Sequence, residues 1–331
     1  MDREQEELQF LGFFGILHES FKIIFNFRKI FSKITLSLIL PLSFVFLAHI
    51  EITNILFSNI LNTEDKLDQT REGTKTHDKL AHMISSEWLG FWLFKLAYFI
   101  FFLILALLST SAVVYTVACI YTAKDITFRK VMSVVPKVWK RLMVTFIWNS
   151  IILFAYNLVA ILVFITWFVI LADTRAGFLF FLILSITYFM GIVYISVVWH
   201  LASVVSVLED TYGIQAMAKS KDLIKGKMGI SIAIFVLLNL SFLLIQFAFE
   251  NLVVIGVGNM GSRVIYAVIC FLLLFLFFLY GLVIQTVIYF VCKSYHHENI
   301  DKSSLADHLE VYLGEYAPLK GKDVQLEQFY V

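Results

Sequence analysis

Six long apolar segments constrain this chain more than any other feature of its sequence. A segment needs about 20 predominantly apolar residues to cross a bilayer core of about 30 Å. Each of the six is long enough, and several are longer, so we expect them to tilt or to continue as helix beyond the hydrocarbon. They predict an all-α polytopic membrane protein with six transmembrane helices and amphipathic cytosolic connecting helices. The predicted spans are about 34–61, 88–120, 142–171, 176–207, 229–256 and 264–292.

The composition supports a membrane protein. Of the 331 residues, 60% are hydrophobic and 15% are charged, whereas soluble domains average about 45–50% apolar and about 25% charged residues. The formal net charge of +1 indicates no strongly charged partner. None of the three cysteines lies in a predicted outer loop, so the sequence predicts no disulfide framework.

Lysine and arginine are unequally distributed between the two sides of the predicted spans. The N-terminal segment, the second and fourth connections and the C-terminal tail carry 19 of them, and the other three connections carry six. Cytosolic loops are enriched in Lys and Arg, so both termini and both basic connections are expected in the cytosol. The chain then divides into a cytosolic N-terminal segment (1–33), a six-span domain (34–292) and a cytosolic tail (293–331).

The second connection, from Ala123 to Met143, has the pattern of an amphipathic helix. At helical spacing its apolar residues share one face and its basic residues share the other. This pattern suits a segment lying in a membrane interface, and the alternative is a solvated connector with a basic bias. Because Pro136 lacks an N–H, the pattern allows one helix or two short pieces broken near Val135. The candidate lipid-interface residues are Arg129, Lys130, Lys137, Trp139, Lys140 and Arg141.

A second interfacial helix is expected directly before the first span. The acidic start of the chain differs from the basic start of a cleavable signal peptide, so we expect this segment to lie on the membrane surface instead. Its apolar positions are Phe21, Ile24, Phe25 and Phe31, and its basic positions are Lys22, Arg28, Lys29 and Lys33.

A few polar residues fall inside the predicted spans, where an ionised group costs about 2.5–3.5 kcal/mol at mid-span. Lys95 is close enough to a span end to extend its ammonium to the interface. His200 is deeper, and we interpret it as a hydrogen-bonded packing residue rather than a proton relay. Amide side chains in spans three and five are expected to form hydrogen bonds between helices.

No motif in the sequence indicates an enzyme, a cofactor or a metal site. It contains no H-E-x-x-H pair, no Walker loop and no G-x-S-x-G elbow. Nucleic-acid binding has no support either, because the basic residues are dispersed along the membrane face. We therefore expect no catalytic, cofactor-binding or metal-binding residues, and no enzymatic activity.

Three stretches carry a resemblance to a plant family of uncharacterised six-span transmembrane proteins. They are LGFFGILHESFKIIF near the start, FSKITLSLILPLSF leading into span one, and the tail EVYLGEYAPLKGKDVQLEQFYV. This resemblance covers nearly the whole length and implies the six-span topology. It implies no activity.

The fourth connection, VLEDTYGIQAMAKSKDLIKGKMG, distantly resembles the membrane domain of some bacterial glycerophosphodiester phosphodiesterases. The pattern consists of an acidic start followed by Gly213, Ala216, Ser220, Leu223 and Gly226. It implies no catalytic residue, because the phosphodiesterase chemistry belongs to a separate domain.

The tail contains a candidate sorting signal. Tyr316 and Leu319 fit the Tyr-x-x-large-apolar form that vesicle-coat adaptors bind. The alternative is a tail that folds back, with its acidic residues facing the basic connections.

We therefore expect a non-enzymatic integral membrane protein of the endomembrane system or plasma membrane. Its expected role is to organise membrane lipid, in particular anionic lipid, or to recruit partners through the tail. The alternative is a carrier or channel for a small solute. The sequence leaves the oligomeric state open.

Overall fold

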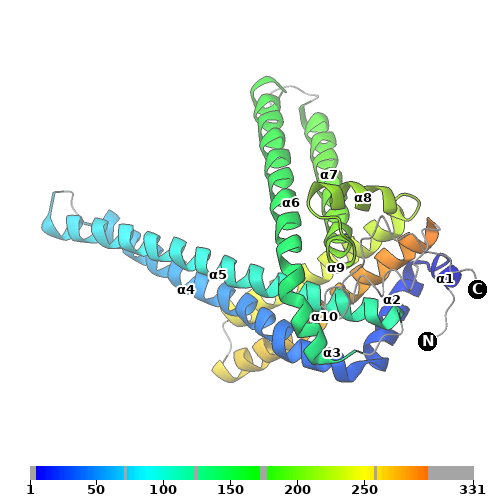
Figure 1. Ribbon diagram of the computed structural model, residues 1–331. Helices are drawn as coiled ribbons and strands as arrows, with labels where there is room; N and C mark the ends of the chain where they lie inside the picture. Colours follow the sequence, from blue (N-terminus) through cyan, green and yellow to red (C-terminus); the bar gives the residue numbers. More distant parts are fainter. Residues whose placement is uncertain (1–4, 71–72, 123–125, 172–176, 257–258, 297–331) are drawn as a thin grey trace, which may run out of the picture.

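The computed structural model describes residues 5–70, 73–122, 126–171, 177–256 and 259–296, and these ranges are helical without a strand (Figure 1). The prediction of an all-α fold is therefore confirmed. The elements are α1 (Gln5–Leu8), α2 (Phe13–Asn26), α3 (Arg28–Ile34), the π-helix η1 (Thr35–Ile39), α4 (Leu40–Asp68), α5 (Lys75–Tyr121), α6 (Phe128–Leu171), α7 (Gly177–Leu208), α8 (Ile214–Leu223), α9 (Met228–Phe249), the π-helix η2 (Glu250–Val254) and α10 (Met260–Tyr295).

Six helices in the described ranges are long and apolar enough to cross a membrane, as the sequence predicts. Several are much longer than a bilayer requires. Helix α5 has 47 residues and α6 has 44, whereas about 20 suffice. At 1.5 Å per residue, each of the two exceeds about 60 Å, so parts of them extend beyond the hydrocarbon.

The long helices form three hairpins, α4/α5, α6/α7 and α9/α10. Figure 1 shows α4/α5 and α6/α7 leaving a common core in different directions. Helix α10 lies at the centre of this core and contacts α2, α4, α5 and α7. We call the hairpin ends in this core the inner ends, and the ends at the loops near residues 70, 174 and 257 the outer ends.

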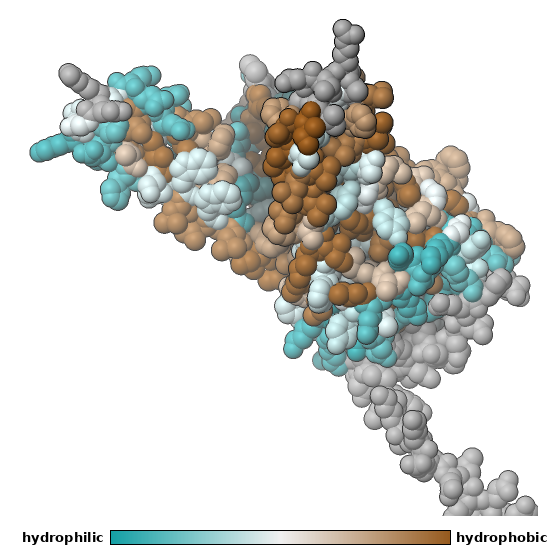
Figure 2. All heavy atoms as spheres, turned by 90° about the horizontal axis from the view of Figure 1, so that it is seen from above, coloured by the Kyte–Doolittle hydropathy of each residue, from teal (hydrophilic) through white to brown (hydrophobic). Residues whose placement is uncertain are grey.

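The inner ends form the packed part of the molecule. Every residue from Ser111 to Ile120 in α5 and from Leu201 to Leu208 in α7 is buried. One hydrophobic cluster joins them to α2, α3, α6, α8 and α10. Apolar side chains at the outer ends are exposed instead, including Phe154 at 72% and Phe178 at 70%. Figure 2 shows this apolar surface along the α4/α5 and α6/α7 hairpins.

Two prolines lie within the long helical segments. Helix α6 continues through Pro136, so the alternative of two short pieces is wrong. Pro136 lies on the exposed face of the helix. Pro41 is the second residue of α4 and follows η1 closely, so it lies at a helix start, where a missing N–H is tolerated.

The first predicted connection, 62–87, is mostly helical. Helix α4 continues to Asp68, and α5 already begins at Lys75. The hydroxyl of Thr63 donates a 3.2 Å hydrogen bond to Glu87 across the hairpin, and the polar tip is visible in Figure 2. The polar side chains of this segment therefore do not end the helices. A paired helical hairpin can expose polar side chains without losing backbone hydrogen bonds.

Candidate functional site

An aromatic row covers one face of α2. Phe14, Phe21 and Phe25 are 81%, 61% and 62% exposed, and their spacing of seven and four residues places them on one side of the helix. The rings of Phe21 and Phe25 stack at 6.3 Å between centroids. The opposite face is buried through Ile16 and Ile23, so α2 carries apolar side chains on both its buried and its exposed face.

Helix α2 is fixed to the core by α10. The hydroxyl of Tyr280 donates a 2.8 Å hydrogen bond to the carbonyl of Leu17. Glu19 and Ser20 are buried in the same contact region, and the Ser20 hydroxyl donates to the Ile16 carbonyl. The aromatic row is therefore held in a defined position by packing on its other side.

A basic row continues this surface along α3. Arg28, Lys29 and Lys33 are exposed, whereas Phe31 and Ile34 on the other side are buried. The predicted helix before the first span is therefore present, with two differences. It is divided at Phe27 into α2 and α3, and Phe31 lies in the core. We call the exposed residues Phe14, Phe21, Phe25, Arg28, Lys29 and Lys33 the α2/α3 surface.

The basic arm predicted between Ala123 and Met143 is the first part of α6. Its apolar face packs in the protein core: Val131, Val135, Val138 and Leu142 are buried, and Trp139 packs against them. The interpretation that this face lies in lipid is therefore corrected, because it packs in the same hydrophobic cluster as the inner parts of α5 and α7.

Most basic residues of this arm lie on the face of α6 that is exposed to the surroundings. Arg129, Lys137 and Lys140 are exposed, and Lys130 is half-buried. Arg141 instead turns toward the α7–α8 junction. Contact of these residues with lipid headgroups stays a prediction.

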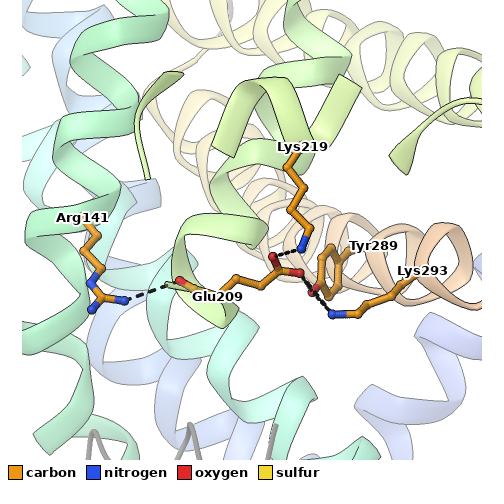
Figure 3. Close-up of polar contacts among 5 residues, drawn as sticks. All are labelled: Arg141, Glu209, Lys219, Tyr289 and Lys293. Carbon is orange, nitrogen blue, oxygen red and sulfur yellow. Dashed lines mark hydrogen bonds and ion pairs between the residues drawn. The ribbon is translucent and has the colours of Figure 1, made fainter. Parts of the chain in front are cut away.

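An ion cluster at Glu209 joins four helices at the inner ends (Figure 3). Glu209 directly follows α7, and its side chain is only 12% exposed. Lys219 of α8 lies 2.6 Å from Oε2. From α10, the Tyr289 hydroxyl and the Lys293 ammonium donate to Oε1 at 2.6 and 3.1 Å. Arg141 of α6 donates to the Glu209 carbonyl at 3.4 Å.

These contacts keep Glu209 ionised. Burial disfavours the charged carboxylate, but the hydrogen bonds from Lys219 and Tyr289 and the charge of Lys293 outweigh it. The pKa of the Glu209 carboxyl is therefore lower than its ordinary value. The cluster therefore holds α6, α7, α8 and α10 together at the inner ends.

The pattern of the fourth connection is explained by packing. Ala216, Ser220 and Leu223 form the buried face of α8, and the Ser220 hydroxyl donates a 2.6 Å hydrogen bond to the Val198 carbonyl of α7. Gly213 has φ +65°, which favours glycine, and its N–H donates to the Thr145 hydroxyl at 2.8 Å. The pattern therefore positions α8 against α7 and α6.

Polar pairs inside the spans were partly missed from the sequence. Lys95 does not extend alone toward the interface, because its ammonium lies 2.9 Å from His49 Nε2 in α4. His49 also stacks on Tyr98 at 3.6 Å between ring centroids. Glu51 of α4 pairs with Arg263 of α10 at 3.6 Å. The signal was available, because His49 and Glu51 interrupt the first apolar segment two residues apart.

The amide prediction is confirmed for Asn157, which accepts a 2.8 Å hydrogen bond from the Tyr188 hydroxyl of α7, but not for Asn239, which donates to the Phe235 carbonyl of its own helix. The backbone carbonyl of His200 accepts a hydrogen bond from the Gln285 side chain. Within the described ranges, no group of three or more His, Cys, Asp or Glu side chains could hold a metal ion. Tyr316 and Leu319 lie outside the described residues.

The comparisons with known proteins provide a family but no functional relative. No curated protein and no solved structure matches the chain significantly. The resemblances to the plant family and to the phosphodiesterase membrane domain stay predictions. The family model of a domain of unknown function, DUF8558, matches residues 1–329, and the chain therefore belongs to that family.

Proposed function

We propose that this protein is a non-enzymatic membrane organiser that holds anionic lipid at the cytosolic side of the bilayer. The α2/α3 surface is the observation that carries the proposal. Its three phenylalanines are more than 60% exposed although α2 is packed on the protein core. Aromatic rings beside basic residues, directly before a transmembrane span, are typical of a helix lying in the membrane interface.

The basic part of the surface supplies the preference for anionic lipid. A Lys or Arg near the surface gains about 1 kcal/mol from anionic headgroups, and the gain falls off within a Debye length. Arg28, Lys29 and Lys33 are exposed at the start of the first span, and Arg129, Lys137 and Lys140 add charge on α6. The expected orientation, with both termini in the cytosol, puts all six at the same leaflet.

The compartment and the partners are also part of the proposal. The endomembrane system or the plasma membrane is supported by the sorting pattern at Tyr316 and Leu319, which vesicle-coat adaptors would bind. Such a tail would recruit partners to the lipid that the membrane domain organises.

The proposal is tested with full-length protein reconstituted in phosphatidylcholine vesicles containing spin-labelled lipids. Electron spin resonance measures the motionally restricted fraction of labelled phosphatidylserine and phosphatidylcholine. We expect the wild-type protein to restrict phosphatidylserine preferentially, with a preference that decreases with salt. Replacing Arg28, Lys29 and Lys33 with Gln should reduce this preference about fivefold or more.

A matched control replaces three lysines at the other end of α4/α5, namely Lys66, Lys75 and Lys79, with Gln. These residues lie at the outer end, so the preference should not change when the labelled lipid is supplied only to the leaflet at the inner ends. Equal restriction of the two lipids by the wild-type protein would contradict the proposal.

The second candidate, a carrier or channel for a small solute, is favoured by the ionisable pairs inside the spans. Lys95–His49 and Glu51–Arg263 lie on helices predicted to cross the bilayer, and such groups often mark solute pathways. Flux of ions and small solutes into proteoliposomes tests this candidate. Flux that Glu51→Gln abolishes would favour it over the lipid role.

A further inference from the structure

A cavity of about 240 Å³ lies between α7, α9 and α10. It is open on one side, where Asn239 at its edge is exposed. Only four of the 17 lining residues, namely His200, Ser231, Asn239 and Gln285, have polar side chains. A cavity with such walls holds water poorly, so an apolar group fits it better than a hydrated solute.

The length of the cavity lining matches that of one acyl chain. It extends along α9 from Ser231 to Phe242 and along α10 from Ile288 to Phe277. Eleven residues of α helix correspond to about 16 Å, close to the hydrocarbon depth of one leaflet, which is half of about 30 Å. Phe242 and Phe277 stack at 5.8 Å between centroids and line the end of the cavity toward the outer ends of α9 and α10.

The other end of the cavity meets a basic turn. Ile224 lines the cavity and is followed by Lys225 and Lys227 in the turn between α8 and α9. Lys225 is paired with Asp222 at 2.7 Å. The Lys227 ammonium instead lies 5.3 Å from the centre of the Tyr295 ring. Lys227 is therefore the cation placed to meet a headgroup.

Tyr295 and Gly226 fix this turn. Gly226 has φ +88°, and a Cβ there would meet the ring of Tyr295. His296 Nε2 lies 2.9 Å from the Lys225 carbonyl. The turn that carries Lys227 is thus bound to the end of α10, next to the end of the cavity that Ile224 lines.

We propose that the cavity between α7, α9 and α10 is a binding site for one anionic phospholipid of the cytosolic leaflet, whose acyl chain fills the cavity and whose phosphate group meets Lys227. This inference rests on the proposed function, because it provides a specific lipid site within a lipid-organising protein. It differs from the α2/α3 surface, which attracts many exchanging lipids, because it retains a single molecule.

The test counts bound lipid by native mass spectrometry of the full-length protein, purified in mild detergent and supplied with phosphatidylserine or phosphatidylcholine. Gly281→Leu is the central variant. Gly281 lines the cavity, and a Cβ there meets no atom within 4 Å, so the added side chain occupies the space of the acyl chain. Replacing a glycine inside a helix also favours the helix, so the variant is expected to fold.

We expect the wild-type protein to retain one phosphatidylserine and Gly281→Leu to lose it. Gly90→Leu is the matched control, because Gly90 also lies inside a long helix with no atom within 4 Å of a Cβ, but on the exposed surface of α5. This control should retain the lipid. Lys227→Gln should lower the ratio of bound phosphatidylserine to phosphatidylcholine about fivefold.

Two other outcomes would overturn the assignment of the cavity. An equal loss of lipid from Gly281→Leu and Gly90→Leu, or retention by both, would mean that the cavity does not hold the lipid. Equal binding of the two phospholipids by the wild-type protein would show that Lys227 does not select an anionic headgroup. If the wild-type protein restricts the two labelled lipids equally in vesicles while one phosphatidylserine is still retained here, the proposed function fails at the α2/α3 surface and the cavity site stands.

Discussion

Replacement of Glu209 by Gln should destabilise the inner ends of the helices. Glu209 holds Lys219, Tyr289 and Lys293 around one carboxylate. Removing one partner of a fully buried ion pair costs about 3–5 kcal/mol. Lys219 is 35% exposed and Lys293 is 17% exposed, so solvent screens part of the attraction, and Gln keeps a hydrogen bond from Tyr289. We therefore expect a loss of about 2–3 kcal/mol in the free energy of unfolding.

The assay is thermal unfolding of the purified full-length protein in detergent, followed by intrinsic fluorescence. A loss of about 2–3 kcal/mol corresponds to a decrease of about 3–4 °C in the unfolding temperature for a chain of this size. Asp222→Asn is the matched control, because Asp222 also pairs with a lysine but at an exposed position, and it should unfold like the wild type. Identical unfolding temperatures for Glu209→Gln and the wild type would refute the argument that this cluster ties the helices together.

The same cluster predicts an acid-sensitive stability. Because the pKa of Glu209 is lower in the folded state, its contribution is fully present above the ordinary glutamate pKa of about 4.3. The contribution is lost as the pH falls through the lower folded-state pKa. The difference in unfolding temperature between the wild type and Glu209→Gln should therefore shrink in acid, and a difference that grows there would contradict the assigned direction.

Two further predictions concern topology and sorting. A glycosylation site engineered near Gly73 should be used and one near Gly213 should not, because the basic connections are expected in the cytosol; the opposite pattern in a gel-shift assay would reverse the orientation. Replacing Tyr316 and Leu319 with Ala should shift the steady-state compartment seen by microscopy without lowering protein abundance, and an unchanged distribution would argue against adaptor binding.

The long helices could be predicted from the sequence because their signal is local. Six apolar runs, each exceeding the bilayer requirement, identify the spans without knowledge of their neighbours. The same holds for the helix before the first span, where Phe21 and Phe25 repeat at helical spacing. Helix α6 shows the limit of this reasoning: Val131, Val135 and Val138 form an apolar face equally suited to lipid or to protein, and only the fold shows that other helices cover it.

The ion cluster and the cavity depend on contacts that sequence spacing does not encode. Glu209 meets Lys293 across 84 residues, and no local pattern pairs them. His49 and Lys95 are separated by 46 residues and likewise meet only because α4 and α5 pack as a hairpin. Such pairs arise from the register between helices, which the periodicity of each single helix leaves open.

The depth of α2 in the membrane tests the central claim most directly. The three native cysteines described, Cys119, Cys270 and Cys292, are buried, so a spin label can be attached selectively to a cysteine introduced at Phe21. In vesicles containing phosphatidylserine, we expect the label at position 21 to collide with dissolved oxygen more than with a water-soluble nickel chelate. A label at Gly73, on the outer tip of the α4/α5 hairpin, should show the reverse. Preferential collision of the position 21 label with the nickel chelate would place α2 in water and contradict the lipid-organising role.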